Sequence, residues 1–128
     1  MPIKLLDHTW PLVKIYVNGE VDGHDLDEHH SRYGAMLRRG KHAIMEITQL
    51  DAPMMTSQVV RLRARFIAEH RQMLADNCMA GAYVLPSAVA RGALKAVSWL
   101  QPLPFPHSVF DTEQDAEPWA RKRLAIHL

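Results

Sequence analysis

Apolar residues along this chain form short runs separated by longer segments in which apolar positions recur with a helical period. Short apolar runs bounded by turn residues predict strands, and the longer periodic segments predict helices. We expect strands at residues 3–6, 12–17, 42–47, 79–85 and 107–110. The run at 12–17 has apolar side chains on both faces, which is typical of an inner strand that is covered on both sides.

Capping residues place the predicted helices between these strands. Helices are expected at residues 24–39, from Thr56 to about residue 75, from Ser87 onward, and after the last strand. In the first helix the spacing predicts an inward stripe made of Leu26, His30, Tyr33 and Leu37. We expect Asp115 to cap the last helix, with Thr112 as the alternative, because Asp115 would leave Pro118 in the tolerated first turn.

The alternation of strands and helices predicts the fold class. Consecutive strands joined through helices pair in parallel by right-handed crossovers. A chain of 128 residues is long enough to bury one core. We therefore expect a single α/β domain over residues 1–128, with a mixed, mostly parallel sheet of about five strands and four flanking helices.

The amino-acid composition limits the kinds of partner and the cellular compartment that we expect for this chain. The 15 Lys and Arg nearly balance the 14 Asp and Glu, so no global field favours nucleic acid. No apolar run is long enough to span a bilayer, and the N-terminal residues do not resemble a signal peptide. The single cysteine, Cys78, excludes an internal disulfide and favours a reducing compartment, so we expect a cytoplasmic protein with Cys78 at a strand edge or in the core.

The densest polar cluster is the segment 24–30, HDLDEHH. On a helix Asp25, Glu28 and His29 share one face, and imidazole with carboxylates can hold a divalent metal. The alternative is a first turn whose acidic residues match the helix dipole beside solvated histidines. We favour the alternative and predict neither a metal nor a cofactor, because the cluster lacks a second group at a diagnostic spacing.

Hydroxyl groups and one arginine follow two of the predicted strands. Asp51, Thr56 and Ser57 lie between a strand and a helix, and Ser87 with Arg91 occupies the same position one unit later. This edge is the usual ligand side of a parallel sheet, and helix N-termini attract anions. We expect these five residues to form the binding surface, with Thr56 and Ser57 as candidate phosphorylation sites; simple helix capping is the alternative.

No motif indicates catalysis. The sequence contains neither a G-x-S-x-G elbow nor a glycine-rich phosphate loop. We predict no catalytic residues; an enzyme would need His24 or His29 to converge on Asp51. The arginines of the long helix are expected on its solvated face, where they could dock an acidic partner: Arg61, Arg63, Arg65 and Arg71.

Three segments resemble STAS domains, which occur in sulfate transporters and in antagonists of anti-sigma factors. They are VNGEVDGHDLDEHHSRYGAMLRRGKHAIMEI, AGAYVLPSAVARGALKAVSWL and PHSVFDTEQDAEPWARKRL. The resemblance is to small, stand-alone bacterial STAS-like proteins, many of them uncharacterised. Regulatory STAS domains carry an Asp-Ser-Ser-Gly type motif whose serine is a phosphorylation switch. The matching segment here, MMTSQV, supplies the hydroxyls of Thr56 and Ser57 without that Asp and Gly.

The resemblance implies a non-catalytic regulatory module that binds a protein partner. Self-association into a homodimer is a further expectation, because STAS-like domains associate through sheet edges or helices. A related fold family binds lipids beside its sheet, so the alternative function is a carrier or sensor of a small apolar ligand. Its cavity would lie between the long helix and the sheet.

Overall fold

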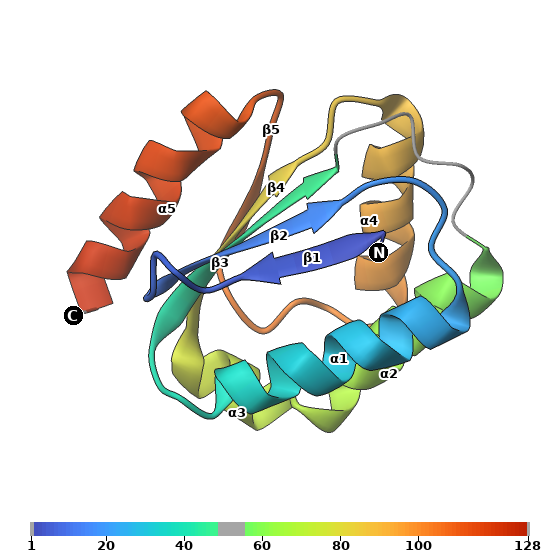
Figure 1. Cartoon of the computed structure of the whole chain (residues 1–128), viewed down its shortest axis with the longest axis horizontal. Helices are drawn as coiled ribbons and strands as arrows, with labels where there is room; N and C mark the ends of the chain where they lie inside the picture. The colour runs from blue at the N-terminus through green and yellow to red at the C-terminus, as the bar shows by residue number, and fades with distance from the viewer. Residues whose placement is uncertain (1, 49–55, 128) are drawn as a thin grey trace.

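The computed structural model describes residues 2–48 and 56–127. Five strands and five helices follow one another in these ranges (Figure 1). Their order is β1 (Ile3–Leu6), β2 (Leu12–Val17), α1 (Gly23–Leu37), β3 (His42–Thr48), α2 (Ser57–Glu69), α3 (Arg71–Asn77), β4 (Cys78–Val84), α4 (Ala88–Leu100), β5 (His107–Phe110) and α5 (Glu113–His127).

The strands form one mixed sheet in the order β1-β2-β3-β4-β5. β1 lies at an edge and pairs antiparallel with β2, whereas β2, β3, β4 and β5 are parallel to one another. All residues of the two central strands, β3 and β4, are buried. The predicted α/β class, with a mostly parallel five-stranded sheet, is confirmed.

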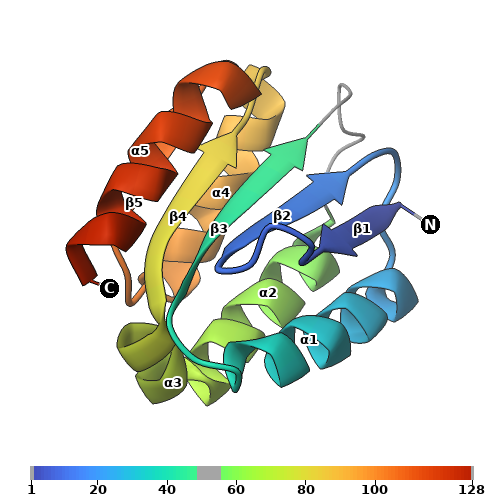
Figure 2. The ribbon, with the colours of Figure 1, turned by 60° about the vertical axis from the view of Figure 1, so that its left-hand side comes forward.

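Helices cover both faces of the sheet unequally. α5 lies alone on one face, and α1, α2 and α4 lie on the other (Figures 1 and 2). Under α5 the sheet presents small side chains, including Ala43, Ala80 and Ala82, which contact Ala116 and Ala120 of the helix. Small residues on both sides let this helix approach the sheet closely. The space available for a ligand therefore lies on the opposite face.

The long helix predicted from Thr56 to about residue 75 is divided. α2 ends at Glu69 and α3 begins at Arg71, because His70 between them has a non-helical backbone (φ −114°, ψ 19°). The His70 ring lies 2.9 Å (Nδ1 to O) from the Phe66 carbonyl and stacks on the Phe66 ring. The His70 N–H still donates to the same carbonyl at 3.0 Å, so the break consists of the backbone angles of this one residue, and it gives five described helices where four were expected.

The predicted start of the last helix is wrong. Thr112, and not Asp115, is the cap: the Asp115 N–H donates to Thr112 Oγ1 at 3.2 Å, and the Ala116 N–H donates to the Thr112 carbonyl at 3.2 Å. Pro118 therefore lies inside α5, beyond the first turn, where it removes one helical hydrogen bond. Burial of Ala116 and Ala120 against the sheet outweighs that loss.

Candidate ligand-binding site

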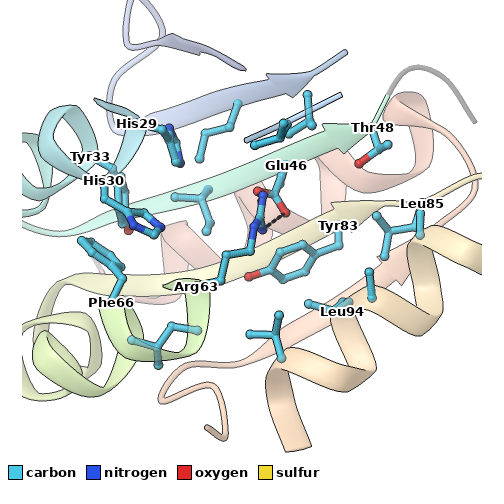
Figure 3. Close-up of a pocket in the computed structure, with 18 of the residues that line it drawn as sticks. His29, His30, Tyr33, Glu46, Thr48, Arg63, Phe66, Tyr83, Leu85 and Leu94 are labelled. Atoms are coloured by element: carbon cyan, nitrogen blue, oxygen red, sulfur yellow. Dashed lines mark hydrogen bonds and ion pairs between the residues drawn. The ribbon is translucent and has the colours of Figure 1, made fainter. Parts of the chain in front are cut away.

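A cavity of about 130 Å³ lies between α1, α2, α4 and the sheet (Figure 3). Most of its lining is apolar, including Ile15, Ile44, Phe66, Leu85, Val97 and Phe105. A dry cavity of roughly 150 Å³ accommodates benzene, so this space, which is partly open to solvent, suits a compact molecule about the size of one ring. The cavity lies between the long helical segment and the sheet, where the ligand-carrier hypothesis placed it.

The strand alternation explains which side chains enter the cavity. In β3, Ile44, Glu46 and Thr48 line the cavity, while the intervening residues face α5. Parallel pairing aligns Ile15 of β2 with Glu46 and aligns Glu46 with Tyr83 of β4. A carboxylate and a phenol hydroxyl therefore stand side by side in an otherwise apolar wall.

Glu46 forms a buried ion pair with Arg63 of α2. Arg63 Nη1 lies 3.0 Å from Oε1 and 3.2 Å from Oε2 of Glu46. The side chains of Glu46 and Arg63 are 10% and 16% exposed, respectively. Arg63 Nε is buried and has no hydrogen-bond partner among the described residues. The pair cancels the charge of two groups that would each be costly to bury alone.

Two histidines of α1 complete the polar part of the lining. His29 is buried and its Nδ1 has no partner within the described ranges, while His30 is half-buried and stacks on Phe66 with ring centroids 4.3 Å apart. Burial lowers the pKa of His29 to about 3, with the Arg63 charge as a smaller cause. Burial, with His29 and Arg63 as smaller causes, lowers the pKa of His30 to about 3 as well. Both imidazoles are therefore neutral at pH 7.

The lining is better suited to binding than to proton transfer. Glu46 uses both oxygens to accept from Arg63. Burial raises the pKa of the Tyr83 phenol well above its usual value and raises the pKa of the Cys78 thiol to about 12. Cys78 is buried in the core, one of the two positions expected from the sequence, and a buried thiol with a raised pKa is a weak nucleophile.

Two of the three hydroxyl residues of the predicted binding surface, Thr56 and Ser87, are helix caps. Thr56 Oγ1 accepts from the Val59 N–H at 3.2 Å and Ser87 Oγ accepts from the Ala90 N–H at 3.1 Å. Thr56 and Ser57 are exposed, and Thr56 also lines the cavity. The capping function predicted for Thr56 and Ser87 is confirmed, and Thr56 joins the strand-end surface to the cavity.

The remaining members of the predicted binding surface are Arg91, whose contacts the structure describes, and Asp51, which lies outside the described residues. Arg91 Nε donates to the Leu85 carbonyl at 3.0 Å, and the guanidinium forms an ion pair with Asp111. These contacts tie α4 to the ends of β4 and β5. Asp51 lies outside the described residues, so the hypothesis that a histidine converges on Asp51 concerns a part of the chain that the structure does not describe.

The histidine segment does not assemble a metal site in the described part of the chain. No group of three metal-binding side chains lies close enough together there. His24 is exposed at the start of α1, while His29 turns toward the cavity. The predicted inward stripe is correct for Leu26, Tyr33 and Leu37, but His29 is more deeply buried than His30.

The ion pair between Glu46 and Arg63 was not predicted from the sequence. Arg63 was expected on a solvated face, yet it points inward, whereas Arg61 and Arg65 are exposed. The available signal was Glu46, a carboxylate inside a run of apolar residues that predicts a fully buried strand. A charge in such a position requires a buried partner, and the arginines of the next helix are candidates because that helix packs on the sheet.

Comparison with known proteins identifies the fold. No protein-family model and no curated protein matches the sequence. An uncharacterized DUF3478-family protein with a SpoIIAA-like fold from Shewanella loihica is 13% identical, with a TM-score of 0.66 over 92% of this chain and 91% of that one. An anti-sigma factor antagonist from Mycobacterium paratuberculosis is 15% identical, with a TM-score of 0.58 over 93% and 92% of the two chains.

A third solved structure is the anti-sigma factor antagonist SpoIIAA in its unphosphorylated form. It is 20% identical, with a TM-score of 0.54, and the alignment covers 94% of this chain and 96% of that one. The chain is therefore a small protein with the STAS-like, or SpoIIAA-like, fold. None of the helices in the described ranges has the length and hydropathy that a bilayer-spanning segment needs.

Proposed function

We propose that this protein is a non-catalytic regulatory module that binds a small, largely apolar ligand in the cavity and a protein partner at the adjacent strand-end surface. The observation that carries the proposal is the cavity itself, which is enclosed by three helices and has Thr56 in its lining. Because Thr56 also caps α2, a ligand that shifts α2 would alter the exposed surface around Thr56 and Ser57.

The partner site in this proposal comprises Thr56, Ser57, Ser87 and Arg91, together with Asp51. The similar anti-sigma factor antagonists support a protein partner, and a second copy of this chain is the alternative occupant. Light scattering of the purified protein distinguishes monomer from homodimer. The single buried cysteine supports a cytoplasmic location.

Phosphorylation of Thr56 or Ser57 would be a second input to the same surface. Both hydroxyl residues stand at the N-terminus of α2, where the helix dipole favours a phosphate. Mass spectrometry of kinase-treated protein would show an added phosphate on one of them. A kinase-treated sample without a mass shift on either residue would remove this input and leave the ligand site in place.

Native mass spectrometry of gently purified protein tests the ligand site. We expect a bound small molecule on the wild type and on Gly92→Ala, whose added methyl group meets open space on α4. We expect loss of the adduct from Ala93→Phe, because Ala93 lines the cavity from the same helix. Ile67→Phe on α2 provides a second way to fill the cavity if the first variant folds poorly.

Wild-type protein that carries no ligand, and that takes up none of the probes described below, would contradict the proposal. Equal occupancy of the wild type and both filled variants would also contradict it, since the ligand would then lie elsewhere.

A further inference from the structure

The charges around the cavity select the kind of ligand. Among the described residues, two charged side chains line its interior, Glu46 and Arg63, and they neutralise each other across 3.0 Å. Glu20, which is exposed, adds a negative charge at the lining's solvent side. The part of the interior that the described residues form therefore has no net charge to offer an ionic ligand.

An ionised ligand would have to leave water without gaining a free counter-charge. A carboxylate would compete with Glu46 for Arg63 and leave one excess negative charge among apolar side chains. An ammonium would compete with Arg63 for Glu46 and leave one excess positive charge. Either case carries the large penalty of an uncompensated charge in an apolar surrounding.

Unsatisfied polar atoms nevertheless disfavour a pure hydrocarbon. Arg63 Nε can only donate, and His29 Nδ1 can donate or accept according to its tautomer; neither has a partner among the described residues. The Tyr83 side chain lies beside Arg63 in the same wall (Figure 3). A ligand hydroxyl or carbonyl would supply the acceptor that this group of residues lacks.

We propose that the cavity selects a compact, uncharged molecule with an apolar body of about one ring and one hydroxyl or carbonyl group, and that the Glu46–Arg63 pair enforces this selection. The inference rests on the proposed ligand-binding function and adds the chemical class of the ligand. The neutral state of His29 and His30 is consistent with it, because neither imidazole supplies a cation at pH 7.

Four probes of matched size test the selection: benzyl alcohol, benzoate, benzylamine and toluene. Their affinities for the wild-type protein are measured at pH 7.5 from backbone amide shifts in two-dimensional NMR titrations. We expect benzyl alcohol to bind at least tenfold more tightly than benzoate or benzylamine and about threefold more tightly than toluene. Benzoate or benzylamine binding as tightly as benzyl alcohol would overturn the inference.

Variants that remove one charge of the Glu46–Arg63 pair should change the preference of the cavity from the neutral probe toward a charged one. Glu46→Gln leaves Arg63 unneutralised, so benzoate affinity should rise at least tenfold while benzyl alcohol affinity stays within about threefold. Arg63→Met leaves Glu46 unneutralised and should favour benzylamine in the same way. Unchanged selectivity in a folded variant would show that the pair does not set the preference.

Different results would contradict the proposed ligand-binding function and the proposed ligand class. If native mass spectrometry finds a charged ligand in the cavity, the proposed function stands and the inference about ligand class is wrong. If no ligand is retained and none of the four probes binds, both are wrong. The wild-type panel decides the inference even where a charge variant does not fold.

Discussion

Glu46 in the middle of β3 and Arg63 on α2 form an ion pair, 3.0 Å between Oε1 and Nη1, beneath the helices that enclose the cavity. Breaking a buried pair from one side leaves an uncompensated charge, which costs about 3–5 kcal/mol. We expect a destabilisation of that size for Glu46→Gln and for Arg63→Met in urea unfolding. The double variant should lose much less than the sum of the two.

An ion pair on the surface serves as the control for these single and double substitutions. Arg65 and Glu69 form an i,i+4 pair on α2 with side chains 69% and 60% exposed. Glu69→Gln should change the free energy of unfolding by only about 0–0.5 kcal/mol. Additive effects of the Glu46 and Arg63 substitutions, each as small as this control, would show that the buried pair does not contribute to the fold as described.

The buried histidines predict loss of stability in mild acid. In the folded protein the pKa values of His29 and His30 are lowered to about 3, whereas the unfolded chain has the ordinary value of about 6.5. Between these values the unfolded state binds more protons, so the free energy of unfolding falls as pH drops below about 6.5. Each histidine contributes a slope of up to about 1.4 kcal/mol per pH unit.

Urea unfolding at pH 7.5, 6 and 5 measures this slope. His29→Leu should flatten it, and His24→Gln, at the exposed start of α1, should leave it unchanged. Burial is the main reason that both imidazoles are neutral, and nearby positive charges add to it: Arg63 and Arg32 act on His29, and His29, Arg63 and His70 act on His30. The same slope in the wild type and in His29→Leu would contradict a buried neutral His29.

Gly81 in β4 is required by the close approach of Phe105. A Cβ at this position would lie 2.5 Å from Phe105 Cε1 and 3.1 Å from Tyr83 Cε2. Overpacking of this kind costs about 1–3 kcal/mol, so Gly81→Ala should lower the free energy of unfolding by that amount. Phe105→Leu in the same background should recover part of the loss by removing the ring edge.

Gly92→Ala is the matched control for Gly81→Ala. Gly92 lies within α4 and an added Cβ meets no atom within 4 Å. Alanine is favoured over glycine inside a helix by about 1 kcal/mol, so this variant should be more stable than the wild type. Equal effects of the two substitutions in thermal unfolding would contradict the described contact at Phe105.

Pro118→Ala should stabilise the protein. Pro118 is exposed inside α5 and cannot donate to the Gln114 carbonyl one turn earlier. Restoring this hydrogen bond should raise the free energy of unfolding by about 1–3 kcal/mol, against the smaller entropic advantage that proline gives in the unfolded chain. Thr112→Ala, which removes the cap, should lower stability by about 1 kcal/mol. A destabilised Pro118→Ala variant would contradict the start of α5 at Glu113 and would favour a later start, capped by Asp115.

Local patterns were sufficient to predict the sheet. The apolar runs and their turn residues locate all five described strands to within a residue or so. The apolar signature is strongest in β3 and β4, because these strands are buried on both faces. Capping residues such as Thr56 and Ser87 were equally visible, since their hydroxyls act on neighbouring amides. Both features depend on residues that are close in sequence.

The site was less accessible to sequence reasoning because it depends on contacts between distant elements. Glu46 and Arg63 are brought together by the crossing of a strand and a helix, and Phe105 enters the wall from the proline-rich loop. The break at His70 depends on the backbone angles of a single residue, and the start of α5 at Glu113 depends on packing against the sheet. Propensity alone gives no measure of either.

The location of a bound probe shows whether the cavity between α1, α2, α4 and the sheet is the ligand-binding site. With benzyl alcohol added to isotopically labelled wild-type protein, intermolecular nuclear Overhauser effects report which side chains touch the ring. If the ring binds in the cavity, we expect contacts to the methyl groups of Ile15, Ile44 and Leu85, which line it. Contacts confined to the open groove between α4 and β5, where Val109 and Lys95 lie, would contradict it, as would the absence of any contact at saturating probe.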